Sequence, residues 1–388
     1  MAELGIGIIG LGRFSRVIAQ ALSDTAGLRL VAAADVSAEQ RAAFASEFPP
    51  LKVYEKIDAL VADPAVDVII VAAPPYLHAE LGRKVLAGGK HLFLEKPGAL
   101  EPQDLAELAR FAKAHGLRTG IDFVMRRNPL YFLLHTFAEK GLFGLPERAY
   151  LENYAHDDHL LPGHWFWDRE KSGGIWIEHG VHFLDIANWL LGPAEWAWAS
   201  DFARPEQNLV ERVVGTVRHK NGCPVSYYHG FTKPEPFEHT VFNLVWERAY
   251  AALDGWIPVR LTLDALVTPE IEDYLTGKIL AETRDWLPDI GVKIEECTVE
   301  LLGRGEVMLR GRGNTFKVTA RLKISYALEA DRWTVYRASV RRGLLELAAA
   351  VGNPARHQAV TLSDAEAALQ VAAALTESAA SGRPVLFT

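Results

Sequence analysis

The first third of the chain alternates short apolar runs with longer amphipathic stretches. The apolar runs at 6–9, 28–34, 66–73 and 91–94 have the length of strands, and the stretches between them are rich in Ala and Glu with helical spacing. Strands and helices in this alternation form a parallel sheet with right-handed crossovers. The pattern predicts an α/β domain over residues 1–122.

The pattern changes near residue 122. Helical spacing and then strand-like alternation follow at 128–140, 177–190, 213–218, 225–231 and 240–246. Alternation of this kind is typical of antiparallel strands with one face packed on a core. We therefore predict a second domain of α+β type over residues 123–388, built on a large, mostly antiparallel open sheet.

Three further elements are expected in the second domain. Residues 269–300 are predicted to form a mostly helical insertion. The chain then ends with two helices, 338–350 and 363–378. A capping box between Ser363 and Glu366 is expected to start the second of these helices.

Composition and charge narrow the possible partners. The chain has 388 residues, of which 49% are hydrophobic and 23% charged, so it is long enough for two folded domains. Its net charge is -8 and its basic residues are scattered, which argues against nucleic acid or an anionic membrane as a partner. No apolar run approaches membrane-spanning length and the start does not resemble a signal peptide, so we expect a cytoplasmic protein.

The two cysteines, Cys223 and Cys297, lie far apart in the sequence. Their spacing predicts neither a disulfide framework nor a thiolate metal site. A reducing compartment is consistent with this usage.

A glycine turn follows the first predicted strand. The segment GLGRFS places Gly10, Gly12, Arg13 and Phe14 between a strand and a helix, with Ser15 at the third glycine position of GxGxxG. Glycine lets the backbone approach a pyrophosphate, and the helix N-terminus offers N–H donors to it. A plain structural turn carries about equal weight for this motif when it is taken alone.

Asp35, at the end of the second predicted strand, favours the nucleotide interpretation. A carboxylate there would accept hydrogen bonds from ribose hydroxyls and would repel a 2′-phosphate, so NAD is predicted rather than NADP. Capping of the helix 37–48 is an alternative role, for which Ser37 competes. Arg41 is the nearest cation in sequence and could simply face solvent.

Two later strand ends carry further candidates. Pro74 and His78 follow the third strand, and Glu95 and Lys96 follow the fourth. Ligands of open α/β sheets bind along the carboxyl edge of the strands, so these four residues are predicted to contact the cofactor. A surface ion pair is the common role of a Glu-Lys pair, but a lysine beside a cofactor could also meet a substrate hydroxyl.

The segment GGIWIEHGVHFLD offers an acid/base group. In a regular helix Glu178, His182 and Asp185 share one face, and His179 lies about a hundred degrees away. A catalytic zinc needs three protein ligands, and the loop 156–159 is an exposed polar loop rather than a source of the third, so no metal is predicted. Taken alone, His182 also fits a core histidine bonded to a carbonyl.

Several motifs together resemble the Gfo/Idh/MocA oxidoreductase family, the group of glucose-fructose oxidoreductase and inositol dehydrogenase. They are GIIGLGRFSR, APPYLH, EKPGAL, SGGIWIEHGVHFLDIANWLLG and ESAASGRPVLF. The resemblance implies a Rossmann domain and a catalytic group of Lys96, Glu178 and His182. Position 178 departs from the family, which usually has Asp there.

The resemblance also suggests substrate contacts and assembly. Arg126 is a candidate contact by position, and His156 and His179 are further candidates. Trp165 and Trp167 could stack on sugar faces, although aromatic residues in such numbers are more often core. The open face of the second sheet often mediates dimer or tetramer formation in the family, so a homodimer or homotetramer is expected.

These features predict an NAD-dependent dehydrogenase of a sugar, cyclic polyol or related hydroxy compound. His182 would take the hydroxyl proton and Lys96 would stabilise the developing alkoxide. An NAD-dependent glycosidase acting through transient oxidation stays open as an alternative. A non-catalytic nucleotide-binding regulator also stays open, but retention of both Lys96 and His182 argues against it.

Overall fold

The computed structural model describes residues 3–387 except 24, 206, 208, 287–290, 312 and 357. The chain forms two compact units, each described by itself. Unit 1 comprises Met1–Val124, Trp165–Asp185 and Arg337–Ala373, and unit 2 comprises Met125–His164, Ile186–Tyr336 and Ala374–Thr388. The sequence suggested two continuous segments, 1–122 and 123–388, whereas unit 1 also contains two later stretches of the chain.

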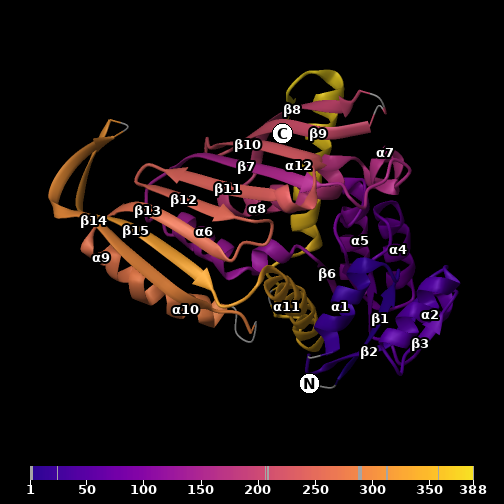
Figure 1. Cartoon of the computed structure of the whole chain (residues 1–388). Coiled ribbons are helices and arrows are strands. Elements are labelled where there is room, and N and C mark those ends of the chain that lie inside the picture. The colour runs from indigo at the N-terminus through magenta and orange to yellow at the C-terminus, as the bar shows by residue number, and fades with distance from the viewer. Residues whose placement is uncertain are drawn as a thin grey trace. The chain divides into compact units, whose positions relative to one another are not determined.

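Unit 1 contains a six-stranded parallel sheet (Figure 1). Its strands are β1 (Leu4–Ile9), β2 (Leu28–Ala34), β3 (Lys52–Tyr54), β4 (Val68–Val71), β5 (His91–Leu94) and β6 (Thr119–Ile121), in the order β3-β2-β1-β4-β5-β6. The strands are short and apolar because the sheet is covered on both faces, and all four residues of β4 are buried. The strand order reverses between β1 and β4, where open α/β sheets bind ligands. The predicted Rossmann domain is confirmed.

Helices connect these strands. The connecting elements are α1 (Arg13–Ser23), α2 (Ala38–Glu47), α3 (Ile57–Val61), η1 (Pro75–Leu77), α4 (His78–Ala87) and α5 (Pro102–Ala114). The later stretches add η3 (Trp165–Trp167), α7 (Arg169–Ser172), η4 (Trp176–Gly180) and parts of α8 (Val181–Leu191), α11 (Arg332–Gly352) and α12 (Leu362–Ser381).

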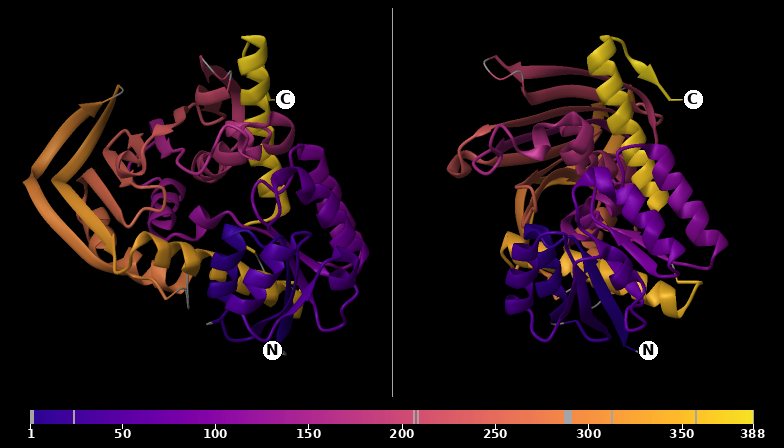
Figure 2. Two further views of the ribbon diagram at one scale, coloured as in Figure 1. Left: turned by 45° about the vertical axis from the view of Figure 1, so that its right-hand side comes forward. Right: turned by 90° about the vertical axis from the view of Figure 1, so that its right-hand side faces the viewer.

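Unit 2 contains a ten-stranded sheet in the order β14-β15-β13-β12-β11-β7-β10-β9-β8-β16 (Figure 2). The strands are β7 (Pro146–His156), β8 (Ala194–Arg204), β9 (Leu209–His219), β10 (Pro224–Lys233), β11 (His239–Trp246), β12 (Ala249–Asp254), β13 (Arg260–Val267), β14 (Ile294–Gly311), β15 (Asn314–Leu328) and β16 (Val385–Leu386). Neighbouring strands are antiparallel except β7 and β10. The predicted mostly antiparallel sheet is therefore confirmed.

One face of this sheet packs on a helix. Alternate residues of β11 are buried, and Phe242 meets Tyr131 of α6 (Pro129–Glu139) with ring centroids 6.1 Å apart. Helix α6 begins where Asn128 caps it and accepts a hydrogen bond from the Leu130 N–H at 2.9 Å. Short 3-10 turns, η2 (Val124–Arg127) and η5 (Glu235–Phe237), complete the unit.

The predicted helical insertion at 269–300 is only partly right. Helix α9 (Pro269–Asp273), the π-helical turn η6 (Tyr274–Lys278) and α10 (Ile279–Trp286) are helical, and 287–290 lie outside the described residues. Residues 294–300 are wrong as helix, because they begin strand β14. From Glu296 to Glu300, polar and apolar side chains alternate with the strand period of two.

The predicted start of α12 is also wrong. The helix begins at Leu362, and its capping box joins Thr361 and Asp364 instead of Ser363 and Glu366. The Thr361 N–H donates to the Asp364 carboxylate at 2.8 Å, and the Asp364 N–H donates to the Thr361 hydroxyl at 3.3 Å. An acidic residue at the third helical position can replace the expected Glu, so the box fits two residues earlier.

Candidate active site

The glycine turn lies at the carboxyl end of β1. Gly10 has a φ of +86°, and a Cβ there would lie 2.6 Å from the Ala72 carbonyl oxygen, so glycine is required. A Cβ on Gly12 would meet nothing within 4 Å, which leaves space above the turn for a ligand. Arg13 and Phe14 are exposed at the start of α1. Ser15 is buried, and its hydroxyl donates to the Gly10 carbonyl.

Asp35 holds the turn through its carboxylate. One oxygen accepts from the Leu11 N–H and the other from the Ser37 N–H, both at 2.8 Å. Ser37 is the N-cap of α2, and its hydroxyl accepts from the Gln40 N–H. The helix cap therefore belongs to Ser37, and Asp35 is left facing the turn.

Arg41 is placed differently from the solvent-facing position considered for it. Its guanidinium donates to the main-chain carbonyls of Asp35 and Val36 at 2.9 and 3.0 Å. It also lies 3.6 Å from the Glu55 carboxylate. A cation therefore lies beside the end of β2, where a ribose would bind. The sequence did not reveal this position, because Arg41 lies more than one helical turn beyond Asp35.

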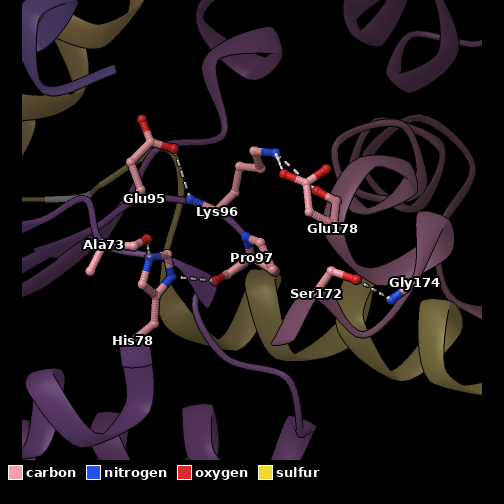
Figure 3. A network of polar contacts seen from close by, with 8 residues as sticks. All are labelled: Ala73, His78, Glu95, Lys96, Pro97, Ser172, Gly174 and Glu178. Atoms are coloured by element: carbon pink, nitrogen blue, oxygen red, sulfur yellow. Dashed lines mark hydrogen bonds and ion pairs between the residues drawn. The ribbon is translucent and has the colours of Figure 1, made fainter. Parts of the chain in front are cut away.

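His78 joins the loops after β4 and β5 (Figure 3). Its two ring nitrogens lie 2.6 Å from the carbonyl oxygens of Pro97 and Ala73. Burial lowers the pKa of the His78 ring, while the two carbonyls favour its protonated form. Both ring nitrogens are engaged by main chain, so this ring links two loops; a contact between His78, or Pro74 before η1, and the cofactor stays a prediction.

Lys96 and Glu178 form the centre of the site (Figure 3). The Lys96 ammonium donates to the Glu178 carboxylate at 2.8 Å and to the Glu178 main-chain carbonyl at 2.9 Å. Both side chains are largely buried, at 12% and 14% exposure. Charge-assisted hydrogen bonds of this kind are stronger where water is excluded. The Glu178 side chain, which is longer than the Asp usual in the family, thus contacts Lys96 directly.

A π-helical turn precedes α8 and changes the geometry expected for the histidines. The segment η4 contains Glu178 and His179, and His182 follows in the first turn of α8. Gly173 and Gly174 both have positive φ and let the chain enter this turn from α7. Single π turns are frequent at functional sites. A regular helix was expected, so this insertion is a correction.

Both histidines lie within the electrostatic reach of Lys96. Burial, followed by the Lys96 charge, lowers the pKa of His179 to about 3. Burial, then Lys96, then His179 hold the pKa of His182 well below its ordinary value. Both rings are therefore neutral near pH 7. His179 was expected on another helix face, but it shares the surroundings of Lys96 with His182.

Asp122 is a site residue that the sequence interpretation missed. Its N–H donates to the Leu94 carbonyl at 2.9 Å, so Asp122 and Glu95 end neighbouring strands. Both side chains are buried, and burial followed by Asp122 raises the pKa of Glu95 well above its ordinary value. Glu95 also accepts from the Lys96 N–H at 3.0 Å. The position of Asp122 after a strand of the parallel sheet was the signal that could have revealed it.

The remaining candidates fall in two places. Trp165 and Trp167 are half-buried in η3 of unit 1, on either side of the buried Phe166. In unit 2 the buried Arg126 guanidinium lies 5.7 Å from the centre of the Trp189 ring. His156, at the end of β7, lies 3.2 Å from the Glu238 carboxylate. Roles for these residues in substrate binding stay predictions.

Two kinds of feature are absent from the residues that the structure describes. No group of three or more His, Cys, Asp and Glu side chains is arranged to hold a metal ion in the described part of the chain. In the same residues, no helix is both long and apolar enough to cross a membrane.

Two family models match the chain. Residues 4–123 match the model described as an oxidoreductase family with an NAD-binding Rossmann fold. Residues 138–245 match the model of the GFO/IDH/MocA C-terminal domain.

Individual relatives match over shorter spans. A 1,5-anhydro-D-fructose reductase of Ensifer adhaerens is 28% identical over 230 residues, which cover 58% of this chain and 69% of that protein. A 2,7-anhydro-N-acetylneuraminate hydratase of Mediterraneibacter gnavus is 31% identical over 196 residues, 50% of each chain. The chain spans 39% and 54% of the lengths of two uncharacterized oxidoreductases of Synechocystis and Bacillus subtilis.

Solved structures match over nearly the whole chain. Scyllo-inositol dehydrogenase of Lactobacillus casei, solved with NAD(H) and scyllo-inositol, has a TM-score of 0.72 at 16% identity and covers 99% of this chain and 98% of its own. At this identity the likeness shows a shared fold.

Proposed function

Since the chain belongs to the Gfo/Idh/MocA oxidoreductase family, we propose that it is an NAD-dependent dehydrogenase of a sugar, cyclic polyol or related hydroxy compound. The observation that carries the proposal is the lysine cluster, by which we mean Lys96, Glu178, His179 and His182. It combines a buried ammonium with neutral imidazoles in one unit. An oxidised nicotinamide, when bound, accepts a hydride from the carbinol carbon of the substrate.

The glycine turn fits a dinucleotide. Space above Gly12 allows a pyrophosphate to approach the main chain, and the start of α1 supplies N–H donors to it. Asp35 faces the turn, and each of its carboxylate oxygens has a second lone pair for a ribose hydroxyl. Arg13 and Phe14 are exposed beside the turn, so they would border the same ligand.

Lys96 would bind the reacting oxygen of the substrate. An ammonium has three N–H donors, and Glu178 accepts two of them, through its carboxylate and its main-chain carbonyl. The third donor remains for a hydroxyl oxygen. As the carbonyl product forms, that oxygen becomes more negative, and a fixed donor stabilises it most at that stage.

His182 would take the hydroxyl proton. A general base must be unprotonated, and burial and the Lys96 charge keep the His182 ring neutral near pH 7. The substrate then loses a proton to the ring and a hydride to the cofactor, which leaves a ketone or lactone. Glu178 would hold Lys96 in place and balance its charge.

Assembly and location complete the proposal. Alternate residues of β7 and β11 on the second face of the unit 2 sheet are half-exposed, which supports a homodimer or homotetramer formed through this face. Cys223 and Cys297 are free thiols, which suits the cytoplasm.

A second candidate function is transient oxidation without net NADH. The relative from Mediterraneibacter gnavus is named as a hydratase, and a hydration leaves no net oxidation of the substrate. The lysine cluster would serve this chemistry equally, because oxidation at one carbon acidifies the neighbouring C–H. A nucleotide-binding regulator is disfavoured, since it needs neither Lys96 nor His182.

The test is a panel of cyclic polyols, aldoses and anhydrosugars incubated with NAD and the purified protein. We expect NADH formation, followed by absorbance, with one of these classes and not with the Lys96→Ala protein. Conversion of the substrate without accumulation of NADH would favour the second candidate. Undiminished NADH formation by Lys96→Ala would contradict the assigned site.

A further inference from the structure

The hairpin of β14 and β15 extends beyond the sheet of unit 2. Strand β13 pairs with β15 only from Ala327 to Ala320. From Val307 to Gly311, the partners of β14 in β15 lie beyond the part that pairs with β13, so this part of the hairpin is a two-stranded ribbon. Figures 1 and 2 show the ribbon bending away from the line of the sheet. A two-stranded ribbon is marginally stable in water unless something packs on it.

Strand β14 is also an exposed edge with apolar side chains. It is the terminal strand of the ten-stranded sheet. Five large apolar residues within ten positions are between 42% and 61% exposed: Val299, Leu301, Leu302, Val307 and Met308. Strand β15 is better covered, since Val318 is buried and the Arg248 guanidinium lies 5.3 Å from the centre of the Phe316 ring. Exposed apolar side chains that cluster in this way mark interaction surfaces.

The charges on β14 are arranged symmetrically about Gly305. Arg304 and Glu306 lie one position on either side of it, and Glu300 and Arg310 lie five positions on either side. A two-fold axis at Gly305 would therefore place each of these charges opposite an unlike charge of a second copy. The same axis places Leu302 opposite Met308. The strand is thus complementary to itself.

The glycines allow two such strands to approach. A Cβ on Gly303 or Gly305 would meet nothing within 4 Å, and Gly305 has a φ of +150° that favours glycine. The register shifts between Leu301 and Gly303 and between Arg304 and Val307, so bulges interrupt β14 there. Bulges oppose a continuous main-chain ladder with another strand. The contact we infer is therefore an antiparallel alignment of the two strands without a main-chain ladder, in which side chains meet around bare glycine backbone.

We propose that residues 299–310 of β14 form a self-association surface that binds the same segment of a second copy of this chain about a two-fold axis at Gly305. Within one chain Arg304 pairs with Glu272 and Glu306 pairs with Lys317. Exposed ion pairs of this kind contribute little stability. Arg304 and Glu306 can therefore also interact with the second copy, so that the ion pairs within and between the chains form one network. The surface lies outside the matched C-terminal model, which ends at residue 245, and it is separate from the proposed contact through the open sheet face.

The first test is cross-linking between two cysteine variants. Leu302→Cys and Met308→Cys are made separately in a Cys297→Ser background, which leaves only the buried Cys223. The axis places residue 302 of one copy beside residue 308 of the other, but holds the two copies of residue 302 about 20 Å apart. A disulfide needs Cα atoms within about 7 Å. A mixture of the two variants should cross-link under mild oxidation, and either variant alone should not.

The second test reverses charges and measures molar mass by light scattering over a range of concentrations. Arg310→Glu would face Glu300 of the second copy and should weaken association at least tenfold. The double variant Glu300→Arg with Arg310→Glu should restore it. The control is Arg29→Glu, which reverses one charge of an exposed ion pair in unit 1. A mixture that cross-links no more than its components, or an Arg310→Glu protein that keeps the wild-type mass profile, would overturn the proposal.

Discussion

The glycine turn and the lysine cluster of unit 1 are held by different kinds of contact. In the turn, the Asp35 carboxylate accepts main-chain N–H groups, and the surface above Gly12 is open. In the cluster, a largely buried ammonium is bound by a carboxylate, and the buried His182 ring and the half-buried His179 ring are kept neutral beside it. Electrostatic interactions gain strength where water is excluded. Substitutions in the cluster should therefore affect turnover far more than substitutions in the turn.

The largest effect is expected from His182→Ala. Loss of the proposed general base should lower kcat by about 10²–10⁴-fold, because that is the usual contribution of a positioned base. The glycine turn is untouched, so the dissociation constant for NAD should change little. The measurement is kcat from NADH formation, with NAD binding by calorimetry as the control. A near-normal kcat would remove His182 from the catalytic group.

Lys96→Met should lower kcat/KM by about 10²–10³-fold, the range for loss of one donor to a developing oxyanion. It should also change the pH profile. A low pKa of His182 places the acidic fall of wild-type activity well below pH 6.5, since activity is lost as pH falls through the pKa of the base. Removing the Lys96 charge removes one cause of that low pKa, so the fall should move to higher pH. An unmoved profile would show that the two side chains do not interact.

The positions at strand ends were predictable from the sequence, because a parallel sheet brings the ends of its strands to one edge. This is why Asp35 and Lys96 were identified before the structure. Glu178 was identified by its place in the helix and by the family resemblance. The contact between the Lys96 ammonium and the main-chain carbonyl of Glu178 was not predicted, because it depends on main-chain geometry.

Features that depend on local departures from regular geometry were missed. The π-helical turn at η4 leaves no periodic signal, since one extra residue in a turn changes the face of His179 without changing the composition. Residues 294–300 were interpreted as helix for a related reason. The register of β14 shifts between Ile294 and Glu296, which interrupts the strand period of two where the strand begins.

Glu178→Gln should have a moderate effect within the cluster. The amide oxygen can still accept from Lys96, and the main-chain carbonyl contact at 2.9 Å is unchanged. The substitution removes the negative charge that orients Lys96. We therefore expect kcat to decrease about tenfold, which corresponds to an increase of roughly 1.4 kcal/mol in the activation free energy. Glu178→Asp keeps the charge but shortens the reach and serves as the matched control. A decrease as large as that of His182→Ala would make Glu178 a proton-transfer group.

The smallest effect on kcat is expected at the turn, where substitutions should change the cofactor preference and leave the catalytic group intact. Asp35 should disfavour the 2′-phosphate of NADP by like charge, so the wild-type protein should prefer NAD. The guanidinium of Arg41 already lies beside this strand end, held by the carbonyls of Asp35 and Val36. Val36 is exposed, so an arginine at this position can reach a bound 2′-phosphate. Asp35→Ser combined with Val36→Arg should therefore move the ratio of kcat/KM toward NADP by about tenfold or more. A factor of ten corresponds to a change in interaction free energy of about 1.4 kcal/mol. Val36→Arg alone is the control, because it adds the cation and keeps the carboxylate. The ratio is measured for both cofactors at fixed ionic strength with one substrate, and a wild-type preference for NADP would mean that Arg41, rather than Asp35, sets the selectivity of the turn.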